Sequence, residues 1–260
     1  MSGIDMRLVG QVTLRARLVV KTGLHIGAGK DQIEIGGIDS PVVKTPAGDP
    51  YVPGSSLKGK LRFLLEWAFG KINASGEVWG NQNGELALDD PILRIFGTAA
   101  KREQWEGGPT RLLMRDAPIS ESWRKTELDA GRELTEAKSE VVIDRIAGKA
   151  MDRVGARQIE RVPPGAEFAF EAAFRIYDLG DGDARDIDCL CWLVQGLDLL
   201  QQDALGGSGS RGYGRVAFRD LTLSRAGKAD LKLDNLFAGL AFDPTQPNAE
   251  LREKIAELVG

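Results

Sequence analysis

The sequence predicts an α+β fold, an elaborated ferredoxin-like sandwich in which helices cover a sheet. Segments with strand-like alternation and segments with helical periodicity occur in the order strand, helix, irregular region, strands, helix, strand. The 260 residues include 42% hydrophobic and 28% charged residues, enough to bury one large core. The length allows one large domain or two small ones. The chain has no internal repeat and no long low-complexity linker, and we expect residues 1–260 to form a single domain.

The first strand and the first helix are predicted in the N-terminal quarter. Residues 11–20 partly alternate and are rich in β-branched residues, as in a strand. Glycines punctuate residues 22–37. A helix is then expected to begin at a cap on Ser55 or Ser56 and to end near Phe69. Its core stripe at helical spacing consists of Leu57, Leu61, Leu64, Leu65 and Ala68.

The middle of the chain is predicted to be less regular. Residues 73–108 are rich in turn formers and indicate an irregular insertion. A hairpin is expected at 138–165, with one arm near 141–146, a tip at 148–155 and a returning arm at 157–162.

The remaining elements follow from the same periodicities. They are strands at 111–114, 167–176 and 216–223, helices at 186–205 and 249–258, and an exposed charged segment at 121–138. The last helix lies in a C-terminal extension at 225–260 and is expected to be an appendage.

Composition indicates a cytoplasmic protein without a membrane segment. No apolar run approaches the roughly 18–20 residues that span a bilayer, and the N-terminus has no secretory pattern. Cys189 and Cys191 are two residues apart on a predicted helix and therefore point to different faces. They cannot form a zinc site, because His25 is the only histidine, and we expect them to be small apolar side chains.

Two widely separated groups of segments combine glycine with cations. The first group lies at 23–27, 36–41 and 53–62, and the second is residues 205–216. Glycine allows the backbone to approach a ligand closely, and nearby Arg and Lys side chains favour phosphate. Two such groups in one chain predict binding of a long anionic polymer, although the net charge is -4.

These segments, together with Ile143–Arg145 and Arg157–Val162, resemble the RAMP superfamily of CRISPR effector subunits in type and in order. The sequence is most similar to the repeated backbone subunits that line the guide RNA in type III-A (Csm) complexes. The resemblance implies an RNA-recognition-motif-like palm, with a β-hairpin thumb at 138–165. It also implies a filament of copies along the guide RNA, contacts with other type III subunits, and metal-dependent cleavage of the target RNA at regular intervals.

The resemblance also assigns candidate residues. Asp39 matches the aspartate of the family's Ile-Asp-Ser-Pro motif, which implies that it is catalytic and binds a divalent metal, Mg²⁺ or Mn²⁺. The local sequence alone favours a turn cap before Pro41 for Asp39, and the resemblance favours the catalytic role. Asp31 and Glu34 are rival carboxylates outside the motif. Further acidic candidates are Asp116, Glu136, Glu140 and Glu160, of which Glu160 is expected to pair with Arg157 or Arg161. The predicted RNA-binding residues are His25, Ser55, Ser56, Lys58, Lys60, Arg62, Arg145, Gly207, Gly209, Arg211 and Gly212.

Three other functions remain open from the residues. The first is a scaffold that binds guide RNA without cutting. The second is a guide-processing endoribonuclease that uses His25 as acid or base without metal. The third is a nucleotide-binding enzyme built on residues 206–214, which the absence of a G-x-x-x-x-G-K-[ST] sequence there disfavours.

Overall fold

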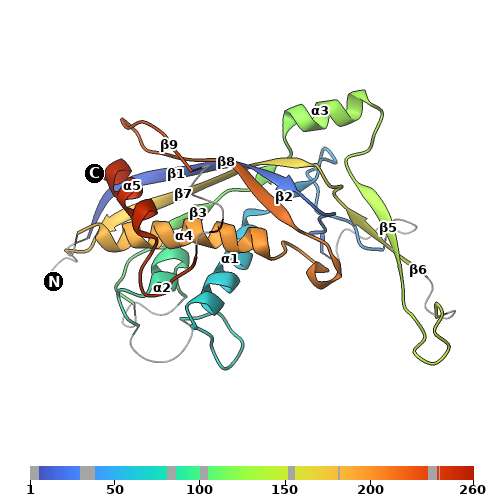
Figure 1. The fold of residues 1–260 in the computed structure, drawn as a ribbon, viewed down its shortest axis with the longest axis horizontal. Coiled ribbons are helices and arrows are strands. Elements are labelled where there is room, and N and C mark those ends of the chain that lie inside the picture. Colours follow the sequence, from blue (N-terminus) through green and yellow to red (C-terminus); the bar gives the residue numbers. More distant parts are fainter. Residues whose placement is uncertain are drawn as a thin grey trace.

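Within the part of the chain that the structure describes, five antiparallel strands form the central sheet (Figure 1). The structure is a computed structural model and describes residues 6–29, 39–80, 86–99, 105–151, 156–180, 182–233, 239 and 241–260. The strand order is β3 (Leu112–Met114), β7 (Glu167–Asp178), β1 (Arg7–Val20), β8 (Val216–Ser224) and β9 (Leu231–Lys232). The four predicted strands are therefore confirmed.

Alternation along these strands separates the two faces of the sheet. In β1, Val12, Leu14 and Leu18 are fully buried, whereas Arg15 and Arg17 are exposed on the other face. Phenylalanines at alternate positions of β7 join the same buried face. Burial of this apolar surface is the main driving force for the fold.

The helices α1 (Gly54–Ala68), α2 (Pro91–Phe96) and α5 (Ala249–Val259) all contact α4 (Ala184–Gln202). Figure 1 shows α1, α2 and α4 on one side of the sheet. The predicted helix at 186–205 corresponds to α4, whose apolar residues are buried, and the helix contacts β7 and β8. The prediction that the last helix is an appendage is wrong, because the apolar face of α5 belongs to the main core and lies against α4 and β9.

The predicted irregular insertion at 73–108 contains α2. Asp90 caps this helix, because its Oδ1 accepts hydrogen bonds from the N–H groups of Ile92 and Leu93 at 2.9 and 3.2 Å. The Asp-Pro pair at the helix start is a known initiation signal that periodicity alone does not reveal. Asp90 also accepts from Lys71 at 2.8 Å, which ties the insertion to the end of α1.

A hairpin of β5 (Glu136–Val141) and β6 (Ala156–Arg161) projects from the body of the molecule, at the right of Figure 1. The predicted hairpin is therefore present, but its first arm begins at Glu136, earlier in the sequence than the predicted 141–146. Pairing begins at Glu136 opposite Arg161, and toward the tip an isolated bridge joins Ile143 to Ala150. The arm escaped prediction because Glu-Ala-Lys-Ser-Glu-Val has no apolar face.

The short strands β2 (Tyr51–Val52) and β4 (Ala117–Pro118) pair with each other, and helix α3 (Glu121–Asp129) precedes the hairpin in the chain. No residue of α3 is buried, as its charged sequence predicts.

Cys189 and Cys191 are buried free thiols, and burial raises the pKa of Cys191 to about 12. Among the described residues, no helix combines the length and apolarity needed to cross a membrane.

Candidate functional site

The two glycine-containing segments, far apart in sequence, lie side by side in the structure. The N–H of Gly207 donates to the carbonyl of His25 at 2.8 Å, and the N–H of Gly214 donates to the carbonyl of Gly23 at 3.0 Å. We call residues 23–27 the first glycine segment and residues 205–214 the second glycine loop. Their backbones form one continuous structure beside the hairpin, because the first glycine segment also exchanges backbone hydrogen bonds with Val162.

Glycine is required where these backbones cross. Gly206 has φ +77°, and a Cβ atom there would lie 2.3 Å from the carbonyl oxygen of His25. Gly214 has φ +74°, and its Cβ would lie 2.0 Å from the carbonyl oxygen of Leu205. Both positions therefore need the left-handed backbone and also the absence of a side chain.

Replacing Gly206 with alanine is expected to destabilise the protein by about 2 kcal/mol or more, through left-handed strain and collision with His25. Gly212→Ala is the matched control, because Gly212 has φ +84° but its Cβ would have nothing within 4 Å. That control should lose only about 1 kcal/mol. Urea unfolding measures both free energies. Equal losses in the two variants would contradict a requirement for close approach.

The second glycine loop exposes one cation and uses much of its own backbone internally. The Arg211 side chain is 62% exposed, and its guanidinium donates to the Ser208 hydroxyl at 2.6 Å. The N–H groups of Gly207, Arg211 and Gly212 bond to the carbonyls of His25, Ser208 and Gly209. Phosphate binding by this loop stays a prediction, and the Arg211 side chain is its exposed charged group.

His25 lies between the two glycine segments and the hairpin. Its Nδ1 is 2.7 Å from the carbonyl oxygen of Glu160, so Nδ1 carries the proton and donates. A Cβ atom at Gly27 would lie 3.5 Å from Nε2, and one at Gly207 would lie 3.4 Å from Cδ2. The imidazole is therefore flanked by glycines from both segments.

Asp39 lies alongside the returning arm of the hairpin. Its carboxylate is exposed, and Oδ2 accepts a hydrogen bond from the N–H of Gln158 at 2.8 Å. The next residue, Ser40, bridges to Ile159 in parallel, and its carbonyl accepts from the N–H of Glu160 at 3.0 Å. The hairpin thus fixes the position of this aspartate. The rivals Asp31 and Glu34, with motif residues 36–38, lie outside the described residues.

The carboxylate of Glu160 anchors the segment that carries Asp39. It accepts hydrogen bonds from the N–H of Val42 at 2.9 Å, from the Thr135 hydroxyl at 2.7 Å and from the Lys44 ammonium. Burial alone would raise the pKa of Glu160, but these hydrogen bonds outweigh it and lower the pKa. The predicted pairing of Glu160 with its neighbours Arg157 or Arg161 is wrong, because Glu160 is only 4% exposed and its side chain faces residues 42–44 instead.

The N-terminus of α1 already holds a carboxylate. The helix begins after Pro53, so the predicted cap on Ser55 or Ser56 is wrong. Asp116 Oδ1 accepts from the N–H of Gly54 at 2.7 Å and thereby occupies the positive helix end beside the predicted RNA-binding residues Ser55 and Ser56. RNA contacts by the two serines stay a prediction.

The cations of α1 also have partners within the protein. Lys58 donates to the carbonyl of Leu112 at 3.2 Å, and burial, followed by repulsion from Arg62, lowers its pKa. Arg62 donates to Glu66 at 2.7 Å and to the carbonyl of Gly97 at 3.2 Å. Both side chains hold α1 to neighbouring segments of the body, and their contact with phosphates stays a prediction.

Two other predicted cations lie closer to the hairpin and the second glycine loop. Lys60 donates to Asp203 at 2.9 Å, just before the second glycine loop. Arg145 is exposed near the hairpin tip. The turn there is fixed by Asp144, whose Oδ1 accepts from the N–H groups of Ile146 and Ala147 at 2.8 and 2.9 Å; these hydrogen bonds lower its pKa.

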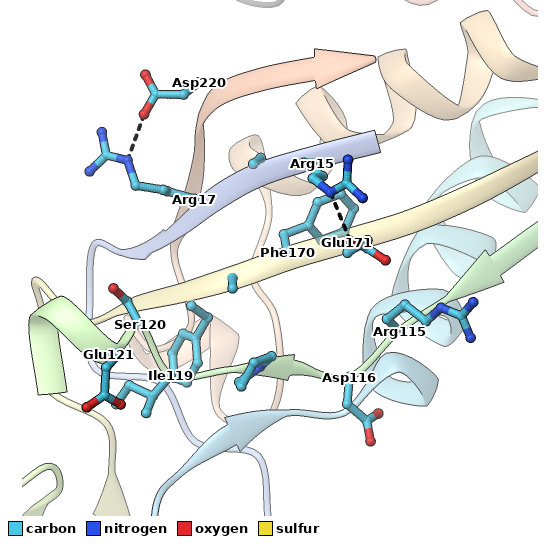
Figure 2. A pocket seen from close by; sticks show the side chains of 14 residues that line it. Arg15, Arg17, Arg115, Asp116, Ile119, Ser120, Glu121, Phe170, Glu171 and Asp220 are labelled. Atoms are coloured by element: carbon cyan, nitrogen blue, oxygen red, sulfur yellow. Dashed lines mark hydrogen bonds and ion pairs between the residues drawn. The ribbon is translucent and has the colours of Figure 1, made fainter. Parts of the chain in front are cut away.

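A depression of about 760 Å³ lies on the sheet face opposite α1 and α4, between β1, β7 and the β4 segment (Figure 2). Its arginines are largely paired: Arg15 with Glu171 at 2.9 Å and Arg17 with Asp220 at 2.7 Å. None of the predicted RNA-binding residues lines it. The candidate site is therefore the convergence of the glycine segments, Asp39 and the hairpin, not this depression.

Comparison with known proteins gives the family. A family model described as the RAMP superfamily matches residues 17–217. A curated protein of Methanocaldococcus jannaschii, named CRISPR system Cms endoribonuclease Csm3, is 38% identical over 219 residues, which is 84% of this chain and 83% of that relative. A Streptococcus thermophilus protein of the same name is 38% identical over 231 residues, which is 86% of this chain and 95% of that relative.

The solved structures agree with the sequence relatives. A chain in the crystal structure of the Csm3-Csm4 subcomplex of the type III-A CRISPR-Cas interference complex is 25% identical, with a TM-score of 0.56. The match covers 98% of this chain and 99% of that one. Fold, motif order and sequence similarity thus converge, and the chain belongs to the RAMP superfamily, where it groups with the Csm3 proteins.

Proposed function

We propose that this chain is a guide-RNA-binding backbone subunit of a type III CRISPR effector complex and that it cleaves target RNA paired with the guide. The observation that carries the proposal is the similarity to curated Csm3 endoribonucleases over most of the chain. The convergence of two glycine segments and Asp39 at the hairpin supports it, because binding and chemistry then share one surface.

The topology supports an RNA-recognition-motif-like palm with a thumb. The order β3-β7-β1-β8, with α1 after β1 and α4 after β7, corresponds to a ferredoxin-like βαββαβ unit. The β5–β6 hairpin is then the thumb at 138–165. On this interpretation residues 1–260 form one elaborated RAMP domain, with an insertion at 73–108 and an extension at 225–260 whose helix completes the core.

The chemistry requires little beyond positioning. RNA supplies its own nucleophile, the 2′-hydroxyl, and holding that oxygen in line with the scissile phosphate provides much of the rate enhancement. Asp39 is exposed, charged and oriented by the N–H of Gln158, so it is the carboxylate that we assign to catalysis.

A divalent ion fits this carboxylate. Mg²⁺ is commonly bound through one or two carboxylates together with waters and substrate phosphates, so it does not need a cage of protein ligands. Among the described residues, no three His, Cys, Asp or Glu side chains form such a cage. Mg²⁺ or Mn²⁺ at Asp39 would supply charge stabilisation at the phosphate.

The RNA contacts that we propose are to the backbone of the nucleic acid. The exposed Arg211 of the second glycine loop, His25, Lys60 and the thumb residue Arg145 carry the strongest case, because each lies at or beside the hairpin or that loop. Contacts of this kind do not depend on base sequence, as a subunit that serves any guide requires. The proposed partners are guide RNA, target RNA, further copies of this chain in a filament and other type III subunits. The proposed location is the cytoplasm.

The RNA that purifies with the protein tests this proposal. The assembled complex should retain short RNAs that begin or end with CRISPR-repeat sequence, and sequencing of the bound RNA measures this. Total cellular RNA from the same cells is the reference. Bound fragments that match the composition of total RNA, without repeat-derived sequence, would argue against a guide-binding role.

A further inference from the structure

Tyr213 of the second glycine loop is buried against the root of the hairpin. Tyr213 is 1% exposed, and its ring lies under two cations, with the Lys138 ammonium 4.5 Å and the Arg161 guanidinium 5.3 Å from the ring centroid. Its hydroxyl donates to Glu140 Oε1 at 2.7 Å. Burial, followed by this hydrogen bond, raises the pKa of Tyr213, so the hydroxyl keeps its proton and remains a donor at physiological pH.

These partners come from both arms of the hairpin. Glu136, Lys138 and Glu140 occupy alternate positions of β5 and share one half-buried face. Arg161 of β6 pairs directly opposite Glu136 and donates to its carboxylate at 2.6 Å. Tyr213 therefore contacts both strands at the point where the hairpin leaves the body.

The other side of Tyr213 is fixed to the glycine segments. Its N–H donates to the carbonyl of Ser208 at 3.4 Å, and the following residue, Gly214, bonds to Gly23. Gly23 also leaves room for Arg161, because a Cβ atom there would lie 2.4 Å from Arg161 Cδ. Tyr213 thus joins the second glycine loop to the hairpin through side-chain contacts.

We propose that Tyr213 is a positioning residue that sets the direction of the thumb relative to the second glycine loop, and thereby selects the phosphate at which the target RNA is cut. The inference rests on the proposed function. Strand residues advance about 3.3 Å each, so the Ile143–Ala150 bridge lies roughly 10 Å beyond Glu140, and the turn that contains Ile146 lies farther out. Over that length a small rotation at the root becomes a larger displacement at the tip.

Loss of the Tyr213 hydroxyl would remove the hydrogen bond to Glu140 at the base of the hairpin. Glu140 Oε2 lies 3.7 Å from Arg211 Nε. Without the Tyr213 donor, Glu140 is free to turn toward Arg211, and β5 loses its hydrogen bond to Tyr213 while the Lys138 ammonium still lies over the ring. A displacement of about 1 Å at a reacting group is enough to reduce a rate by about 10²-fold.

The first test measures cleavage of target RNA by a complex that carries Tyr213→Phe and is reconstituted with guide RNA. We expect cuts to spread to phosphates adjacent to the wild-type position and the single-turnover rate to fall by about 10-fold or more. Guide affinity should stay within about 5-fold of wild type, because an exposed pair between Glu140 and Arg211 competes only weakly with an RNA contact. Tyr177→Phe is the matched control, because it removes a tyrosine hydroxyl on the palm sheet and should leave the cuts unchanged. Cuts by Tyr213→Phe at the wild-type position and rate would overturn the inference.

A second test needs no cleavage. Spin labels at Gln11→Cys on β1 and Ile146→Cys at the fully exposed tip report the thumb direction, since the native cysteines are buried and do not react. Pulsed electron resonance on labelled protein diluted in unlabelled protein should give a broader or shifted distance distribution in Tyr213→Phe than in Tyr213 protein. An unchanged distribution overturns the positioning role. A wild-type complex that does not cut overturns only the proposed function.

Discussion

Replacement of Asp39 with alanine is expected to slow cleavage of guide-paired target RNA by about 10²-fold or more. Asp39 is exposed at the returning arm of the hairpin, and the N–H of Gln158 orients its carboxylate. Removing the side chain takes away a negative charge at the reacting phosphate, where it would hold a divalent ion or accept a proton. Guide binding should be retained, because among the described residues the hydrogen bond of the Asp39 carboxylate is to Gln158 on the hairpin and not to a glycine segment.

The measurement is single-turnover cleavage by complexes of equal guide content. Asp39→Asn separates charge from position, because the amide oxygen still accepts from Gln158, and it should lose activity as alanine does. Asp220→Asn is the matched control: Asp220 is an exposed aspartate paired with Arg17 on the far sheet face. Wild-type rates in Asp39→Ala would assign the chemistry to another residue. A wild-type complex that binds target and never cuts would instead support the scaffold alternative.

A structural feature of this molecule was predictable from sequence where its cause lies within the segment that forms it. The strands β1, β7 and β8 and helix α4 were predictable, because their apolar residues repeat at the period of the element that they form. The hairpin arm β5 was misplaced, because its half-buried face is made of Glu136, Lys138 and Glu140, and the last two contact the distant Tyr213. A strand stabilised by polar contacts with a distant loop has no periodic apolar signal.

Side-chain partners illustrate the same limit within the candidate site. Glu160 has arginines next to it in sequence, yet it binds Lys44, which is 116 residues away. Tyr213 donates a hydrogen bond to Glu140, which is 73 residues away in sequence. It was not among the predicted site residues, although it lies within the second glycine loop. Composition likewise cannot distinguish a cation that binds protein carbonyls, as Arg62 does, from one that binds phosphate.

The largest effect on stability is expected from Asp186→Asn. Asp186, Arg94 and Arg111 all have side chains with 0% exposure. Asp186 Oδ1 accepts from Arg94 at 2.9 Å, Oδ2 accepts from Arg111 at 3.0 Å, and Oδ2 also accepts from the N–H of Tyr177 at 2.8 Å. One carboxylate on α4 therefore connects α2, the residue before β3, and β7.

Asparagine would keep an acceptor but remove the anion that the two arginines share. Breaking a buried ion pair by neutralising one partner costs about 3–5 kcal/mol, because the remaining charge stays buried. Urea unfolding measures the loss. Asp188→Asn is the matched control on the same helix: Asp188 pairs with Arg252 near the surface, at 26% and 41% exposure. A pair that water screens contributes about 0–1 kcal/mol. Similar losses in the two variants would show that burial of the Asp186 cluster adds nothing to the attachment of the insertion to the sheet.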